Sequence, residues 1–250
     1  MITEIVNSKS YQGFGKKVLY TQDLIRIFVK GYVDERPLIR EFLQNKITVA
    51  TVHGRQYYKI INALKSMDLE YESLPPEQAA TSNAKIIITT KDEASIISKK
   101  DILLDTEFDK YPVLLKAKIM RLFVSSYQDD QLTIGIDPGS RIGISIIYLD
   151  KEIESFVESS PASTIRLLSI LLGGIHSKKK IVRIGDGDMA MSTYLANMIK
   201  AAFRESVKVE IVDEHGTSLP RYSETNRRGV RDRSSARRIA LRSGRAFNPC

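Results

Sequence analysis

The sequence predicts an α/β fold in two parts, a small α/β domain over residues 1–128 and a larger mixed-sheet domain over residues 129–250. Three features of the sequence lead to this prediction. Strand and helix patterns alternate along the first part. The second part shows three strand patterns in a row and then strands separated by helices, which gives the order β-β-β-α-β-α-β-α. A polar segment, SSYQDDQ, lies between the two parts.

The sequence pattern of residues 1–128 predicts a small α/β domain with a few strands and helices. Its expected elements are one or two helices over 21–44, a strand over 47–52, a helix over 55–67, a short strand over 69–74, a break at Pro75-Pro76, a strand over 85–90 and a helix within 105–128. The runs ITVATV and KIIITT are apolar and β-branched, so we expect them to pair side by side. No catalytic pattern occurs in this part, and its expected role is accessory.

The second part begins with a predicted hairpin. LTIGID and IGISIIYLD are strand patterns joined by the turn sequence PGSR, and EIESFVES follows as a third strand. The remaining expected elements are a helix over 163–172, a strand at KIVRIGDGD, a helix over 191–203, a strand at VKVEIVDE and a last helix over 228–241. Gly173 and Gly174 predict the end of the first of these helices.

Composition narrows the class of protein. Apolar residues make up 42% and charged residues 27% of the 250 residues, as is usual in globular proteins. The single cysteine and three histidines argue against a disulfide framework and a structural zinc site. No apolar run reaches membrane-spanning length and the N-terminus has no signal-peptide pattern, so we expect no membrane partner and a cytoplasmic location.

The net charge of +8 favours a polyanionic partner, and most of it lies in one segment. Residues 221–245 contain nine arginines, no lysine and two acids, a net charge of +7. Because the guanidinium group matches phosphate oxygens, this segment predicts nucleic-acid contacts, although a solvated basic helix has the same pattern. The expected nucleic-acid-binding residues are Arg141, Arg227, Arg228, Arg231, Arg238, Arg242 and Arg245, of which Arg231, Arg238, Arg242 and Arg245 are expected to line one helix face.

Carboxylates stand at the ends of three strand patterns in the second part. Asp137 ends the first strand, Asp186 and Asp188 the fourth, and Asp213 and Glu214 the fifth. If these strands are parallel neighbours, their carboxyl ends meet at one edge of the sheet, where ligands gather in open α/β sheets.

Asp232 in the last helix is expected to join these acids. Ala236, Ile239, Ala240 and Ser243 share its helix face. Packing of this small and apolar face on the sheet would carry Asp232 inward.

Several carboxylates that converge need a compensating cation, because they cannot all ionise close together. Oxygen-only ligands suit Mg²⁺ or Mn²⁺, and two such ions about 4 Å apart assist phosphodiester hydrolysis. The candidate metal ligands are Asp137, Asp186, Asp188, Asp213, Glu214 and Asp232, and the candidate catalytic residues are Asp137, Asp186, Glu214 and Asp232. The choices between Asp186 and Asp188 and between Asp213 and Glu214 stay open. Each acid also has a structural alternative, as a turn residue, helix cap, solvated strand end or helix-dipole partner.

The motif IGIDPGSRIG over 134–143 resembles the first motif of the RuvC-type Holliday junction resolvases and the related YqgF family, both of the RNase H-like superfamily. Asp213-Glu214 with Thr217-Ser218 resembles the fifth-strand element of the YqgF group, and Asp232 with the residues after it resembles the final-helix acid. The resemblance spans about residues 132–245 and implies an RNase H-like fold with Asp137 as a metal ligand. RuvC places a glutamate at the end of the fourth strand and two acids in its last helix, so the chain resembles a mixture of the two groups.

These features predict a divalent-metal-dependent endonuclease that acts on branched DNA, such as a Holliday junction, in DNA recombination and repair. We expect a homodimer, which would place two sites on two strands. The alternatives are an RNA-processing nuclease, as the resemblance to YqgF implies, and a non-catalytic nucleic-acid-binding protein. An actin-like ATPase is disfavoured, because the 113 residues after Asp137 are too few for a second nucleotide-binding lobe.

Overall fold

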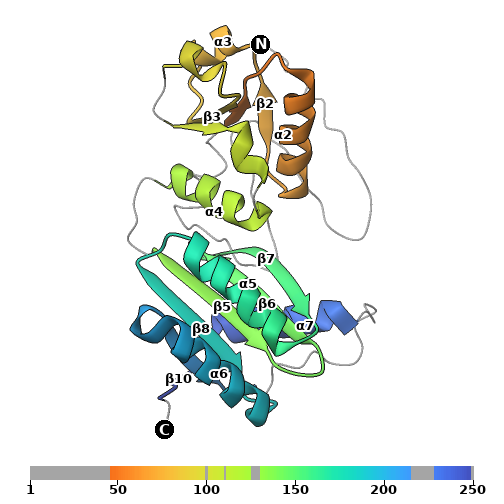
Figure 1. Ribbon diagram of the computed structural model, residues 1–250, viewed down its shortest axis with the longest axis vertical. Helices are drawn as coiled ribbons and strands as arrows, with labels where there is room; N and C mark the ends of the chain where they lie inside the picture. The colour runs from red at the N-terminus through yellow and green to blue at the C-terminus, as the bar shows by residue number, and fades with distance from the viewer. Residues whose placement is uncertain (1–45, 99–100, 110, 125–129, 215–227, 249–250) are drawn as a thin grey trace, which may run out of the picture.

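The computed structural model describes residues 46–98, 101–109, 111–124, 130–214 and 228–248. The α/β class predicted from the sequence is confirmed, because helices pack on one four-stranded and one six-stranded sheet. In Figure 1 the four-stranded sheet lies above the six-stranded sheet, with helix α4 (Pro112–Phe123) between them. The helices predicted over 21–44 lie outside the described residues. Among the helices in the described ranges, none has the length and apolar character needed to cross a membrane.

The first sheet is parallel throughout, with the strand order β2-β1-β3-β4. Its elements are β1 (Ile47–Val49), α2 (Gly54–Ser66), β2 (Tyr71–Ser73), α3 (Pro76–Thr81), β3 (Ile86–Thr89), the 3-10 turn η1 (Ala94–Ile96), β4 (Ile102–Leu104) and the 3-10 turn η2 (Asp105–Asp109). The predicted pairing of ITVATV with KIIITT is confirmed by β1 and β3. The sequence pattern does not predict α3 or β4. The sequence predicts a break in regular structure at Pro75-Pro76, but Pro76 is the first residue of α3, because proline is tolerated in the first turn of a helix.

The second sheet is mixed, with the strand order β10-β9-β8-β5-β6-β7. Its elements are β5 (Gln131–Asp137), β6 (Ile142–Tyr148), β7 (Lys151–Glu158), α5 (Pro161–Gly174), β8 (Lys179–Gly185), α6 (Met189–Phe203), the 3-10 turn η3 (Arg204–Ser206), β9 (Lys208–Val212), α7 (Arg228–Leu241) and β10 (Arg245–Ala246). The predicted strands and helices occur in the predicted order, and the predicted hairpin is the antiparallel pair β5–β6. Helix α5 includes Gly173 and Gly174, which the sequence places just after it.

Alternation along β5 separates the two faces of the second sheet. Ile134 and Ile136 are buried in a core that also contains residues of α5 and α6. Gly135 points to the opposite face, where α7 packs. A Cβ at Gly135 would overlap the carbonyl oxygen of Ala236, so glycine permits the close approach of the helix. Figure 1 shows α5 and α6 in front of the sheet and α7 behind it.

Helix α4 packs against both sheets. Val113 and Ala117 belong to the core of the second sheet. Leu115 and Ile119, from the other side of the helix, belong to the core of the first. Residues two apart on a helix point in different directions, so α4 carries two apolar faces.

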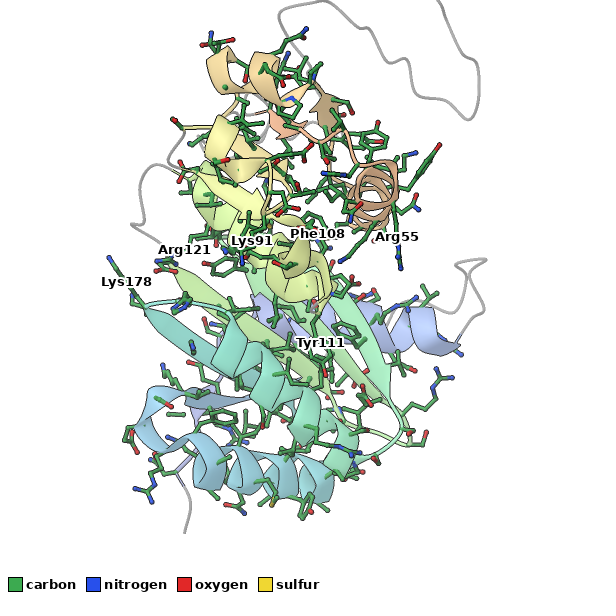
Figure 2. All side chains as sticks on the ribbon, turned by 45° about the horizontal axis from the view of Figure 1, so that its top comes forward. Arg55, Lys91, Phe108, Tyr111, Arg121 and Lys178 are labelled. Carbon is green, nitrogen blue, oxygen red and sulfur yellow. The ribbon has the colours of Figure 1, made fainter. Side chains whose placement is uncertain are left out.

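Arg121 fixes α4 to the second sheet. Its Nη1 atom lies 3.0 Å from both carboxylate oxygens of Asp130. The same nitrogen lies 3.0 Å from the Tyr148 hydroxyl and 3.0 Å from the His176 carbonyl oxygen. One guanidinium, labelled in Figure 2, therefore ties α4 to the start of β5, the end of β6 and the segment after α5.

Candidate active site

The carboxyl ends of three strands meet at one edge of the second sheet. Strand β8 pairs in parallel with β5 on one side and with β9 on the other. Asp137 is the last residue of β5, Asp186 follows β8 directly, and Asp213 and Glu214 follow β9. The parallel arrangement required by the sequence-based prediction is confirmed, and it brings these acids to one edge.

Helix α7 carries Asp232 to the same edge. Its predicted apolar stripe is buried, as Ala236 and Ile239 show. Gly143, which pairs with Asp137 across the β5–β6 ladder, lies against this helix. A Cβ at Gly143 would overlap the Asp232 carbonyl oxygen. The missing side chain at this position therefore lets the helix bring Asp232 next to Asp137.

Asp137 has the most perturbed carboxyl group of the site. Burial, and then the charges of Glu214 and Asp232, raises the pKa of Asp137 from 3.8 to about 7. A hydrogen bond from Ser235 opposes this rise. Three carboxylates thus lie close enough for their charges to interact, and the one at the end of β5 is the hardest to ionise without a cation.

Ser235 is a site residue that the sequence pattern does not single out. Its hydroxyl donates a hydrogen bond to the Asp137 carboxylate. Ser235 lies three residues after Asp232 in α7, and residues at this spacing share a helix face. Its three-residue spacing from Asp232 is the sequence feature from which its place in the site could have been predicted.

The Glu214 carboxylate lies against the backbone at the end of β8. A Cβ at Gly185 would overlap Glu214 Oε1, and a Cβ at Gly187 would lie 2.5 Å from Oε2. Burial raises the pKa of Glu214, an N–H donated by Gly187 opposes the rise, and the Asp186 charge adds to it. The Glu214 N–H donates to Asp186 Oδ1 over 3.0 Å. A side chain from the end of β9 therefore occupies the end of β8.

Asp188 and Asp213, two further predicted metal ligands, are more exposed than Asp186 and Glu214. Asp188 is exposed and caps α6, because its Oδ1 accepts the Met191 N–H over 3.0 Å. Asp213 is exposed, and its carbonyl oxygen accepts a hydrogen bond of 3.2 Å from Arg242 Nη1. Asp186 and Glu214 are half-buried and contact each other, so the geometry favours Glu214 over Asp213 as a metal ligand, and it assigns Asp188 to the helix cap.

Arg141 is a predicted nucleic-acid-binding residue that forms an ion pair with one of these carboxylates in the described part of the chain. It belongs to the turn between β5 and β6, and its Nε lies 3.7 Å from Asp232 Oδ2. Half of its side chain, 51%, stays exposed. Arg141 can therefore reach solvent, or a phosphate group, from the rim of the site.

The remaining arginines do not form the predicted helix face. Arg231 is exposed and Arg238 half-buried on α7, but Arg242 follows the helix and Arg245 lies in β10. The prediction of one face is wrong because α7 ends at Leu241, so helical spacing does not apply beyond it. Arg227 and the Arg228 side chain lie outside the described residues.

The acids present fit a divalent cation by their chemistry. Their donors are all carboxylate oxygens, as Mg²⁺ and Mn²⁺ prefer. Asp232 Oδ2 is buried and accepts no hydrogen bond within the described part of the chain. In the described ranges, no three acidic, histidine or cysteine side chains form a ready metal-binding group. Asp137 interacts with Glu214 and Asp232, and Glu214 also interacts with Asp186, so Asp137 and Glu214 are each in electrostatic contact with two other acids.

Comparison of this chain with protein-family models and with curated proteins finds no match.

Proposed function

We propose that this protein is a divalent-metal-dependent endonuclease that hydrolyses phosphodiester bonds in branched DNA, with an RNase H-like domain over residues 129–250. The strand order β7-β6-β5-β8-β9 supports this fold assignment, because β5, β6 and β7 are antiparallel neighbours and β5, β8 and β9 are parallel ones. The resemblance of IGIDPGSRIG to the first RuvC and YqgF motif supports the same assignment.

The observation that carries the proposal is the meeting of Asp137, Glu214 and Asp232. They come from a strand end, the residue after another strand, and a helix. Burial, and then the charges of Glu214 and Asp232, raises the pKa of Asp137 to about 7. A folded protein gains no stability from such a cluster of like charges. A cation that binds there would relieve the repulsion, which is the arrangement expected of a metal-dependent hydrolase.

Asp137, Glu214 and Asp232 would hold the Mg²⁺ or Mn²⁺ ions, of which we expect two. When bound, such ions lower the pKa of a water molecule and stabilise the negative charge on the leaving oxygen. Ser235 orients the Asp137 carboxylate by its hydrogen bond. Arg141, beside Asp232 at the rim, would bind a phosphate group of the substrate, because a guanidinium donates two parallel hydrogen bonds to phosphate oxygens.

A substrate panel tests the proposal. The protein is incubated in Mg²⁺ or Mn²⁺ with four-way junctions, flaps, duplex DNA and single-stranded RNA. We expect cleavage of the junction, its loss in Asp137→Asn, and its retention in Asp150→Asn. Asp150 is a suitable control because it is exposed in the β6–β7 turn, at φ 59°, where asparagine is well tolerated. Cleavage that Asp137→Asn leaves intact would refute the assignment.

The same panel addresses the other candidates. Cleavage of RNA alone would favour the RNA-processing nuclease. The third candidate, a non-catalytic nucleic-acid-binding protein, is favoured by the exposed side chains of Arg141 and Arg231, which could bind phosphate groups without a metal ion. That candidate predicts binding without metal-dependent turnover. Light scattering of the protein with and without a four-way junction tests the proposed homodimer.

A further inference from the structure

We propose that Asp186 is a positioning residue that holds Glu214 in place, and that Glu214 supplies the carboxylate used at the end of β8. The catalytic part of this inference rests on the proposed endonuclease function. The structural part rests on contacts between the segment after β8 and the segment after β9.

Reciprocal hydrogen bonds join these two segments. The Asp186 N–H donates to the Val212 carbonyl oxygen over 3.0 Å. The Glu214 N–H donates to Asp186 Oδ1, also over 3.0 Å. In the other direction, the Gly187 N–H donates to the Glu214 carboxylate. Each acid therefore accepts a backbone N–H from the segment that carries the other, which fixes both segments together.

The glycines beside Asp186 leave the space that Glu214 fills. Both glycines lie against the Glu214 carboxylate, and a Cβ at Gly185 would also lie 2.7 Å from Ile239 Cδ1 on α7. The carboxylate thus lies against the backbone at the end of β8, and Ile239 of α7 lies close to the same glycine. The segment around Asp186 is shaped to receive the Glu214 side chain.

The contact made by Asp186 requires a hydrogen-bond acceptor and no negative charge. A backbone N–H is neutral, and the oxygen of an asparagine side chain can accept from it in the same geometry. A metal ligand, by contrast, depends on its charge. Replacing Asp186 by asparagine therefore separates the two roles, because it keeps the acceptor and removes the charge.

The experiment compares four full-length variants with the wild type: Asp186→Asn, Asp186→Ala, Glu214→Gln and the control Asp150→Asn. The first measurement is the hydrogen-exchange rate of the Glu214 amide by NMR, without metal or substrate. The second is Mn²⁺ affinity by calorimetry, and the third is the cleavage rate on the best substrate of the panel. Circular dichroism confirms that each variant is folded.

Loss of a hydrogen bond to a charged acceptor should speed exchange of the Glu214 amide about ten- to a hundredfold in Asp186→Ala. Asp186→Asn should change this rate, the Mn²⁺ affinity and cleavage by about fivefold or less, because the asparagine oxygen still accepts the hydrogen bond although it carries no charge. Glu214→Gln should lose Mn²⁺ affinity and cleavage about a hundredfold or more, as expected of a lost charged ligand. Asp186→Ala should fall between these two variants in the last two measurements.

Two results would overturn the inference. One is an unchanged Glu214 exchange rate in Asp186→Ala. The other is a loss of Mn²⁺ affinity in Asp186→Asn as large as that in Glu214→Gln, which would make Asp186 a ligand. If the wild type cleaves no substrate, the proposed function fails, but the exchange measurement still decides whether Asp186 positions Glu214.

Discussion

The ionised Asp137 should make the metal-free protein less stable as the pH rises. Its pKa is about 7 in the folded protein and 3.8 in the reference state. A pKa raised by folding means that the folded state binds the proton more tightly. The associated stability is fully present below the unfolded pKa of 3.8 and is lost as the pH rises through the folded pKa of about 7.

The size of the effect follows from the two pKa values. Each unit of pKa difference corresponds to about 1.4 kcal/mol. Between about pH 5 and about pH 8, Asp137 alone should lower the free energy of unfolding by about 2.5 kcal/mol. Asp137→Asn removes this contribution, because asparagine carries no charge and its oxygen can still accept the hydrogen bond from Ser235.

Urea unfolding in the presence of EDTA, at several pH values, measures the effect. The wild type should lose stability towards high pH, and Asp137→Asn should lose about 2.5 kcal/mol less. The exposed control Asp150→Asn should follow the wild type. Equal pH dependence in the wild type and Asp137→Asn would show that Asp137 ionises normally. Added Mn²⁺ should restore wild-type stability at high pH by about 2.7 kcal/mol at a hundred times its Kd.

Three further predictions concern packing and charge. Gly143→Ala should lower the free energy of unfolding by about 3 kcal/mol in urea titrations, because the added methyl group overlaps the α7 backbone. The control Gly173→Ala, which adds a methyl group in open space on α5, should raise the free energy of unfolding by about 0.5 kcal/mol. Glu210→Gln should cost about 3 kcal/mol and lower the Tm in calorimetry, because it weakens the buried pair in which Glu210 Oε2 lies 2.9 Å from Arg183 Nε. Arg141→Gln should weaken binding to a four-way junction and reduce the slope of log affinity against log salt by about 0.9, and an unchanged slope would exclude a phosphate contact.

Local patterns were sufficient for much of the fold and part of the site. Alternation and apolar runs identify the long strands of the second sheet, and the stripe on α7 correctly predicts that Asp232 faces inward. The position of the Glu214 carboxylate depends on the backbone of another strand, so no local pattern reveals it. Likewise, Arg245 lies in the very short strand β10, which is defined by its pairing with β9 and carries no periodic signal.

The two apolar faces of α4 have a consequence for the whole molecule. Side chains of the same helix belong to both hydrophobic cores. If either sheet unfolds and α4 leaves its place, buried side chains of the other core become exposed. The free energies of the two parts are therefore coupled, and heating should give one calorimetric peak instead of two. A polypeptide that starts at residue 129 would lack α4, and the core residues of the second sheet that Val113 and Ala117 cover would be exposed to solvent.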